Sequence, residues 1–553
     1  MKATRSRPSF KHKTAMGKVL ECPIPVPWGW DAEPLRDNIP TRNSILKKIY
    51  KTDNMILSKS RFLDYLTCPK DAWFRLYRPE LEEFKITEEL QNRFDQGDEV
   101  EAYAKQLKNF AGMVEAKSRG SEAQKEIDAL IAKKVPAIYQ ATFIADGYII
   151  RCDVLKWNTE TGKWDLYEIK ATNSLHASGE RDHLSDVAFQ SIVLESYGIP
   201  LGRTYIVHLN KEYIRKGPID IESLFIQNDC TPKIDARKKT IVSEMKIAKK
   251  YLSQEKEPKD GCNCHYRGRS SHCATFSRSH PEIPEYSVHD LAYIGKSANK
   301  LKELVKQGLY HLHEIKDVST FTDRQQNQIF VQKEKDPIII NKEIENILNG
   351  YAYPLYFLDY ETFAPAVPIY DGYSPYKRIP IQFSLHYIEK KGGPLKHIDY
   401  VHKENSDPAD VVAKYLTDSI DPLGTVLAWN VGFERSVTNE LASRVPRDEK
   451  ALQRICTQMQ DQMDVFTNQY YVHKDFKGSA AIEAVMNVLL PDMTYDHLPY
   501  TGEVVGFVWW KDIVSTTAPT VERTEKIRLI REYCKQDTLV MVEIFKILSG
   551  MIK

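Results

Sequence analysis

The sequence predicts an α/β protein with several domains, and three observations lead to this fold class. The chain has 553 residues, which at about 150 residues per domain corresponds to three or four domains. Hydrophobic residues make up 42% and charged residues 28% of the chain, as in proteins that bury sizeable cores. Strand-like runs alternate with amphipathic helical runs in two separate regions. Disordered, collagen-like and fibrous classes are thereby excluded.

The same patterns divide the chain into four segments. The first 52 residues hold 11 Lys and Arg against 4 Asp and Glu, which favours a solvated basic tail over a phosphate-binding arm. The expected segments are a basic extension over 1–56, a β-rich domain over 57–280, a helical linker over 281–350 and a second α/β domain over 351–553.

In the β-rich domain, strands precede a helix. Asp146-Gly147 predicts a tight hairpin turn, and residues 158–162 predict a second turn. Gly198 and Pro200 end the helix that follows. The expected elements are a helix from Ser58, strands over 141–145, 148–157 and 163–171, a helix over 184–197 and a strand over 204–209. The resulting order is β-β-β-α-β.

The carboxy-terminal domain again mixes strands with helices, which is typical of an α/β fold. It follows a linker with helical segments near 287–350. The expected strands cover 356–362, 381–388, 397–402 and 425–430, and the expected helices cover 408–420, 432–443, 479–490 and 521–549. The sequence contains no GxxxxGK[ST] motif, so ATP hydrolysis is not indicated.

The second hairpin of the β-rich domain predicts a cluster of charged side chains. Pairing in register puts Trp157 opposite Trp164 and Asp153 opposite Glu168. Lys170 then shares a face with Glu168, because strand side chains alternate with a period of two. Two acids and a lysine suit metal-assisted phosphodiester hydrolysis, in which carboxylates hold Mg²⁺ or Mn²⁺ and lysine neutralises developing charge. Ordinary surface charge is the alternative.

At these residues the chain resembles the PD-(D/E)xK nucleases, specifically their RecB-like branch. The matching elements are Asp153, then Glu168-Ile169-Lys170, then a helix that carries Gln190. The resemblance implies a restriction-endonuclease-like fold, metal ligation by Asp153 and Glu168, and catalytic roles for Lys170 and Gln190. Further candidates under the same resemblance are Tyr197, Glu99 and Glu101.

Four cysteines flank this region, one before it and three after it: Cys68, Cys262, Cys264 and Cys273. Four converging thiolates can hold an iron-sulfur cluster and join the two ends of a domain. Some RecB-like nucleases carry a bracketing [4Fe-4S] cluster, so the resemblance implies one here. A zinc site that uses His265 and His272 is one alternative, and reduced cysteines without metal are another.

A second set of acids lies in the carboxy-terminal domain. Asp359 and Glu361 stand two residues apart in an apolar strand and therefore face the same side. Burying two carboxylates is costly unless a cation neutralises them. Glu434 follows another apolar strand, and Tyr533 and Asp537, four residues apart, share one face of the last helix.

These motifs resemble the DEDD exonucleases of the RNase H-like superfamily, in the variant whose third motif is Tyr-x-x-x-Asp. The resemblance implies two divalent ions about 4 Å apart and a tyrosine, Tyr533, that orients the attacking water. Most of the family has Asp where this chain has Glu434, and we expect a structural role for the further acid Asp464. The four implied metal ligands are Asp359, Glu361, Glu434 and Asp537.

Together, the two resemblances cover residues 57–280 and 351–550, a combination that looks like a bacterial family described only as a domain of unknown function. They imply a metal-dependent nuclease, with 3′-to-5′ exonuclease activity in the carboxy-terminal domain, a second RecB-like site, and DNA favoured over RNA as substrate. One alternative is a nucleic-acid-binding or assembly subunit of a defence or repair complex, with one or both sites vestigial. A ribonuclease is the other.

The sequence also bears on where the protein acts. It contains no run of about 18 apolar residues and no apolar signal core near Met1, so we expect a cytoplasmic protein without membrane contact. The formal net charge is +1, which neither indicates nor excludes a nucleic-acid partner. Protein partners from a defence or repair system are a further expectation.

Overall fold

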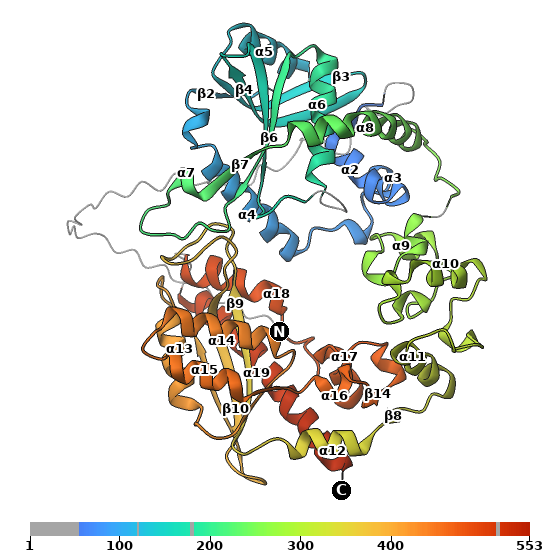
Figure 1. The fold of residues 1–553 in the computed structure, drawn as a ribbon, viewed down its shortest axis with the longest axis vertical. Coiled ribbons are helices and arrows are strands. Elements are labelled where there is room, and N and C mark those ends of the chain that lie inside the picture. Colours follow the sequence, from blue (N-terminus) through green and yellow to red (C-terminus); the bar gives the residue numbers. More distant parts are fainter. Residues whose placement is uncertain (1–54, 119–120, 177–181, 261, 516–519, 553) are drawn as a thin grey trace, which may run out of the picture. The chain divides into compact units, whose positions relative to one another are not determined.

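The structure is a computed structural model that describes residues 55–118, 121–176, 182–260, 262–515 and 520–552. The described part is mixed α/β, with two large sheets and one two-stranded sheet (Figure 1). The expected basic extension over 1–56 lies almost entirely outside the described residues. None of the helices in the described ranges is both long and apolar enough to cross a bilayer.

The first sheet has seven strands in the order β2-β3-β4-β5-β6-β7, with β1 paired to β4. Its strands are β1 (Leu57–Ser58), β2 (Met113–Glu115), β3 (Ala137–Ala145), β4 (Tyr148–Asn158), β5 (Lys163–Lys170), β6 (Leu201–Leu209) and β7 (Phe225–Asp229). Its helices are α2 (Lys59–Thr67), α3 (Pro69–Tyr77), α4 (Glu88–Ala104), α5 (Ser121–Ala132), α6 (His183–Tyr197), α7 (Ile221–Leu224) and α8 (Thr231–Leu252).

The expected β-β-β-α-β order is confirmed by β3, β4, β5, α6 and β6. Asp146 and Gly147 have positive φ angles of 52° and 78°, the backbone of a tight hairpin turn. Trp157 pairs with Trp164 in the next hairpin, so the expected register is confirmed. The ladder between β4 and β5 ends at Val154 and Tyr167, one position before Asp153 and Glu168.

The two faces of β5 have different partners, because alternate side chains point to opposite sides of a strand. Tyr167 and Ile169 pack into an apolar cluster with Val100 of α4. Glu168 and Lys170 point to the other face, where they contact side chains of α6. Glu168 and Lys170 therefore lie between the sheet and α6.

The segment after α8 contains short helices and turns around small apolar clusters. Its helices are η4 (Asn263–Tyr266), η5 (Arg269–Ser271), α9 (Phe276–Ser279), η6 (Val288–Asp290), η7 (Ile294–Lys296), α10 (Ala298–Lys306), η8 (Leu312–Glu314), α11 (Asp323–Glu334) and α12 (Asn341–Asn349). A short strand, β8 (Ile338–Ile339), pairs with β14 (Tyr471–Val472). The expected helical linker therefore includes irregular turns and a strand.

The carboxy-terminal sheet has the order β11-β10-β9-β12-β13. The central strand β9 runs antiparallel to β10 and parallel to β12. The strands are β9 (Leu355–Phe363), β10 (Ile379–Ile388), β11 (Leu395–Val401), β12 (Thr425–Ala428) and β13 (Met459–Asp461). The helices are α13 (Ala409–Ser419), α14 (Gly432–Arg444), α15 (Glu449–Gln458), α16 (Asp464–Thr467), η9 (Lys474–Phe476), α17 (Ile482–Leu489), α18 (Gly502–Val508), the π-helix η10 (Trp509–Val514) and α19 (Thr520–Met551).

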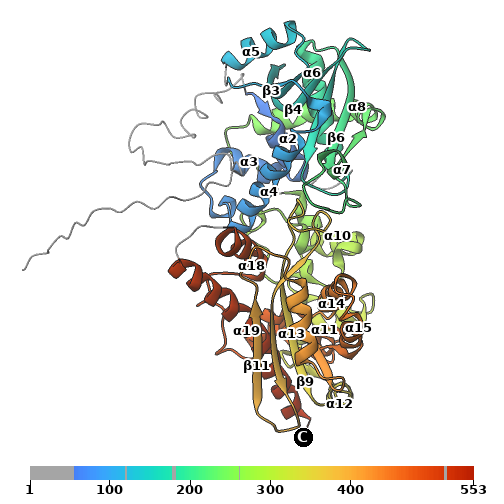
Figure 2. The same cartoon turned by 90° about the vertical axis from the view of Figure 1, so that its left-hand side faces the viewer.

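This sheet is the middle of three layers, with α13 and α14 on one face and α19 on the other (Figures 1 and 2). Tyr356 and Leu358 of β9 pack into the core under α13, α14 and α15. Leu355 and Phe357 pack into the core under α19. Because side chains alternate along the strand, Asp359 and Glu361 continue the row that faces α19.

Candidate metal centres

The acids of the carboxy-terminal domain come from three elements that surround the end of β9. Asp359 and Glu361 lie on β9 itself, which is hydrogen-bonded on both sides. Glu434 lies in the first turn of α14, and Asp537 lies on α19. One central strand and two flanking helices thus hold the four predicted metal ligands.

Ligand atoms of Asp359, Glu361 and Cys534 lie within 4.8 Å of one another. The Cys534 thiol donates a hydrogen bond of 3.2 Å to Asp359 Oδ2. Tyr533 also turns toward the site, since a Cβ atom at Gly502 would lie 3.4 Å from its hydroxyl and 3.9 Å from Glu361 Oε2. Cys534, which the sequence patterns did not single out, therefore joins the predicted residues.

Burial raises the pKa of each of these four carboxyl groups. The pKa of Asp359 rises to about 6. Burial, and then the nearby Asp359 charge, raise the pKa of Glu434 to about 9. The same two causes raise the pKa of Glu361 and of Asp537. Among the described residues, no lysine or arginine forms an ion pair with any of the four.

A hydrogen bond fixes Asp537, whereas Glu434 has an unpartnered oxygen atom. The Tyr495 hydroxyl donates to Asp537 Oδ1. The backbone of Asn430 donates to Asp461, which helps to fix the turn before α14. Glu434 is 3% exposed, and its buried Oε2 has no hydrogen-bond partner among the described residues. A buried carboxylate oxygen without a donor indicates a missing cation or proton.

The residues predicted for the amino-terminal site also come together, with two additions. Glu168 accepts hydrogen bonds of 2.8 Å from Lys170, Gln190 and Lys59. Asp186 of α6 pairs with Lys170 and accepts a 2.9 Å hydrogen bond from Gln190. Lys59 and Asp186 were not predicted from the sequence.

Asp153 lies at the edge of this cluster. It accepts a 2.8 Å hydrogen bond from the backbone nitrogen of Ile169. Burial, and then the nearby Glu168 charge, raise its pKa. Burial alone would raise the pKa of Asp186, but Lys170 and Lys59 lower it. The amino-terminal acids thus have internal cations, in contrast to those around β9.

The three further candidates of the amino-terminal domain, Glu99, Glu101 and Tyr197, differ in where they lie relative to the cluster around Glu168. Glu101 accepts hydrogen bonds of 2.6 Å from Tyr139 and Gln140, and its charge contributes to the raised pKa of Asp153. The Tyr197 hydroxyl donates to Asp128 Oδ1, outside the cluster around Glu168. Glu99 is exposed on α4.

The four cysteines that flank the first sheet meet at one point. Their Sγ atoms all lie within 4.8 Å of one another, and those of Cys262 and Cys273 are 3.9 Å apart. Cys68 lies between α2 and α3, and Cys262 precedes η4, which contains Cys264. This cluster has the ligands to bind a metal, and it joins residues about 200 positions apart in the sequence.

Neither histidine of the alternative zinc set belongs to this cysteine group. The His272 ring stacks on Phe276 with centroids 3.5 Å apart, and its Nε2 bonds to the carbonyl oxygen of Arg267. His265 contacts His280 instead, with 3.1 Å between the two Nδ1 atoms. The cysteines therefore form a four-sulfur set of their own.

A family model matches part of the carboxy-terminal domain. Residues 356–481 match a family described as a domain of unknown function, DUF2779. The matched stretch contains Asp359, Glu361 and Glu434 and ends before Tyr533 and Asp537. No curated protein matches the chain significantly. The matched region is thus the part of the chain that carries three of the four acids around β9.

Proposed function

We propose that the chain is a metal-dependent nuclease whose principal active site is the acid cluster around β9. The observation that carries this proposal is a charge imbalance: Asp359, Glu361, Glu434 and Asp537 are gathered without a basic partner among the described residues. Since burying several carboxylates together is costly without cations, the cluster suits divalent metal ions. Oxygen-rich sites of this kind suit Mg²⁺ and Mn²⁺.

The donor set fits this chemistry. Asp359, Glu361, Glu434 and Asp537 would hold the ions, which when bound activate water and neutralise charge on a scissile phosphate. Tyr495 holds Asp537 in place through its hydroxyl. The Tyr533 hydroxyl lies beside Glu361 at Gly502, where it can orient a water molecule by hydrogen bonding. Burial raises the pKa of Tyr533, so this hydroxyl keeps its proton.

The fold around the acids supports the same proposal. The acid-bearing strand β9 lies at the centre of the sheet with β10 antiparallel to it, and we propose that this sheet is that of an RNase H-like domain. Helices α14 and α19 bring one acid each from opposite faces of the sheet. The proposed activity is 3′-to-5′ exonucleolytic hydrolysis of nucleic acid, with DNA as the favoured substrate.

The substrate and direction of cleavage are tested with 5′-labelled single-stranded DNA, duplex DNA and RNA in the presence of Mn²⁺. We expect a ladder of 5′-labelled products that shortens with time for wild type and is absent for Asp359→Asn. Asp492→Asn is the matched control, because Asp492 is exposed. Failure of the metal-loaded protein to cleave any of the three substrates would reject the nuclease proposal.

The amino-terminal cluster supports a second candidate function. Lys59 and Lys170 already neutralise Glu168 and Asp186. A RecB-like nuclease site would need Lys59 to move before metal could bind. If Asp153→Asn leaves every cleavage rate unchanged, this domain serves binding or assembly, as in the alternative of one vestigial site.

For the cysteine cluster we propose a single zinc ion. Zinc-sulfur bonds of about 2.3 Å place tetrahedral sulfurs about 3.8 Å apart, close to the 3.9 Å between Cys262 and Cys273. A [4Fe-4S] cluster inserts eight atoms between the thiolates and would hold them farther apart. Metal analysis of anaerobically purified protein tests this: we expect zinc without iron, whereas stoichiometric iron and sulfide would support the cluster.

A further inference from the structure

A second group of ligand atoms lies next to the cysteine cluster. It consists of His265, His280 and Glu282, whose ligand atoms all lie within 4.8 Å of one another. His265 follows Cys264 directly in η4. Nothing in the proposed nuclease activity uses these three residues. Their ligand atoms are close enough to share a metal ion or a proton.

The hydrogen bond of His280 determines which ring nitrogen faces the group. His280 is 6% exposed, and its Nε2 lies 3.2 Å from the carbonyl oxygen of Cys262. A carbonyl oxygen only accepts, so Nε2 carries the hydrogen and Nδ1 of the neutral ring presents its lone pair. Nδ1 lies 3.1 Å from His265 Nδ1 and 3.2 Å from Glu282 Oε1. A lone pair and a carboxylate at this distance repel each other unless a cation or proton lies between them.

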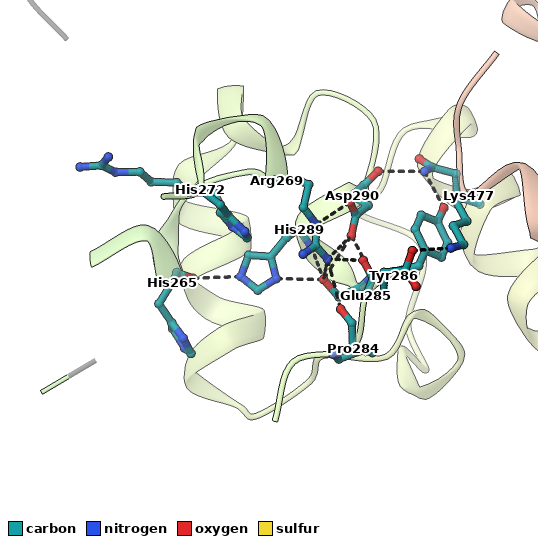
Figure 3. Close-up of polar contacts among 12 residues, drawn as sticks. His265, Arg269, His272, Pro284, Glu285, Tyr286, His289, Asp290 and Lys477 are labelled. Carbon is teal, nitrogen blue, oxygen red and sulfur yellow. Dashed lines mark hydrogen bonds and ion pairs between the residues drawn. The ribbon is translucent and has the colours of Figure 1, made fainter. Parts of the chain in front are cut away.

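A hydrogen bond from His289 holds the backbone of His265 in place. His289 Nε2 bonds to the backbone carbonyl of His265 at 3.0 Å (Figure 3), and the centroids of the two rings lie 6.2 Å apart. His289 in turn contacts Ser287 Oγ at 3.0 Å, which is part of the network around Arg269 and Asp290 in Figure 3. The backbone at His265 is therefore held while its ring faces His280.

The spacing of the group matches a bound metal ion. Zinc bonds of about 2.0–2.1 Å to nitrogen or oxygen put tetrahedral ligands about 3.4 Å apart, near the observed 3.1 and 3.2 Å. A histidine ligand that donates its second N–H to a backbone carbonyl is the usual supporting arrangement. The three residues are among those that line an open cavity of about 540 Å³, which leaves room for water as a fourth ligand.

We propose that His265, His280 and Glu282 bind one divalent transition-metal ion of the zinc type, separate from the metal of the four cysteines. Two imidazoles and one carboxylate suit zinc and the neighbouring first-row ions. The η4 turn then supplies Cys264 to one ion and His265 to the other. The second ion has an open position toward the cavity, whereas four thiolates saturate the first.

The test is the zinc content of the full chain after equilibration with Zn²⁺ and gel filtration. We expect Glu282→Gln and His265→Gln each to lose one zinc per chain relative to wild type. Glu282 is exposed, so its substitution leaves the fold intact. The matched controls are Glu314→Gln and His313→Gln, two exposed residues in a nearby turn, which should keep the wild-type content.

Cobalt substitution separates the two sites. Co²⁺ bound to thiolates gives an intense charge-transfer band that imidazole and carboxylate ligands do not give, so this band should persist in Glu282→Gln while one cobalt per chain is lost. Equal metal content in Glu282→Gln and wild type would overturn the proposal and assign the close contacts to a protonated His280. Loss of the thiolate band together with the ion in Glu282→Gln would overturn it as well, since the two sites would then not be separate.

Discussion

At the residue scale, the two acid clusters differ in what neutralises them. Glu168 and Asp186 have Lys59 and Lys170 within ion-pair distance. Asp359 and Glu361 have other acids and the Cys534 thiol nearby, and no lysine or arginine of the described residues forms an ion pair with them. Removing one carboxylate should therefore destabilise the metal-free protein at the amino-terminal site and stabilise it at the site around β9.

Glu168→Gln leaves two largely buried lysines without part of their counter-charge, and such losses cost about 3 kcal/mol.

Asp359→Asn removes a charge that the fold buries at a cost, so it should raise the melting temperature in EDTA. It should also abolish the rise that Mn²⁺ causes in wild type by mass action. Urea unfolding and thermal melts with and without Mn²⁺ measure these effects. A lower melting temperature for Asp359→Asn in EDTA would contradict the charge-imbalance argument.

The raised pKa values of Asp359 and Glu434, about 6 and about 9, predict the pH dependence of metal binding. In the metal-free fold these acids retain protons at pH values at which the unfolded chain has already released them. Folding stability should therefore fall as the pH rises from the carboxyl pKa values of the unfolded chain toward those of the fold, about 6 for Asp359 and about 9 for Glu434. Metal must displace the same protons. The apparent affinity for Mn²⁺ should therefore increase between about pH 6 and pH 9. Calorimetric titration over this range measures it, and a pH-independent affinity would refute the assignment.

Several site residues could not be predicted because sequence patterns specify neighbours along one element only. Tyr533 and Asp537 follow from their spacing of four, but Cys534 lies inside the same motif and nothing marks it. Asp186 had a signal, because it lies one turn before Gln190 on α6. No pattern in the sequence marked Lys59, because α2 reaches the site only through tertiary packing.

At the scale of elements, the close packing of α18 against β9 fixes the acid-bearing strand. A Cβ atom at Gly506 would lie 2.6 Å from the carbonyl oxygen of Thr362 and 3.2 Å from the Cα atom of Phe363. These two residues directly follow Glu361. Any side chain at Gly506 must therefore push α18 away from the strand that positions the acids.

Gly506→Ala should destabilise the protein by about 1–3 kcal/mol, the usual cost of overpacking, and should weaken Mn²⁺ binding. Gly550→Ala on α19 is the control, because a Cβ atom there meets nothing within 4 Å. It should be neutral or stabilising by up to about 1 kcal/mol, since alanine favours the helix. Equal stability of the two variants in urea would show that α18 does not press on β9.

Elements with a clear turn or period were predictable, whereas buried and short ones were not. The hairpin register followed from the two turns, and the bounds of α6 followed from Gly198, whose φ of 95° ends the helix. The apolar run that forms α18 and η10 shows no helical or strand periodicity of apolar residues. Val505, Val508 and Trp509 are buried among other elements on several sides. α15 and β13 were also missed: Pro446 separates α15 from α14, but β13 has only three residues and follows α15 directly.

At the scale of the whole molecule, the cysteine cluster links distant parts of the chain. Cys68 precedes most of the first sheet, while the other three cysteines follow it. Metal binding here closes a long loop and adds its binding free energy to folding. Cys264→Ser should therefore lower the melting temperature and increase proteolysis between α8 and α10. Ser253→Ala is the control, and an unchanged melting temperature for Cys264→Ser would indicate that the cysteines hold no structural metal.

The central claim is that the acids around β9 carry out phosphodiester hydrolysis, and the Mn²⁺-dependent cleavage rate tests it most directly. Saturating nucleic acid should be cut by wild type, and Asp359→Asn should reduce kcat by about 10²- to 10³-fold with little change in KM, since several kcal/mol of transition-state stabilisation are lost. Asp492→Asn should keep the wild-type rate. A wild-type rate for Asp359→Asn, with Mn²⁺ bound, would contradict the account.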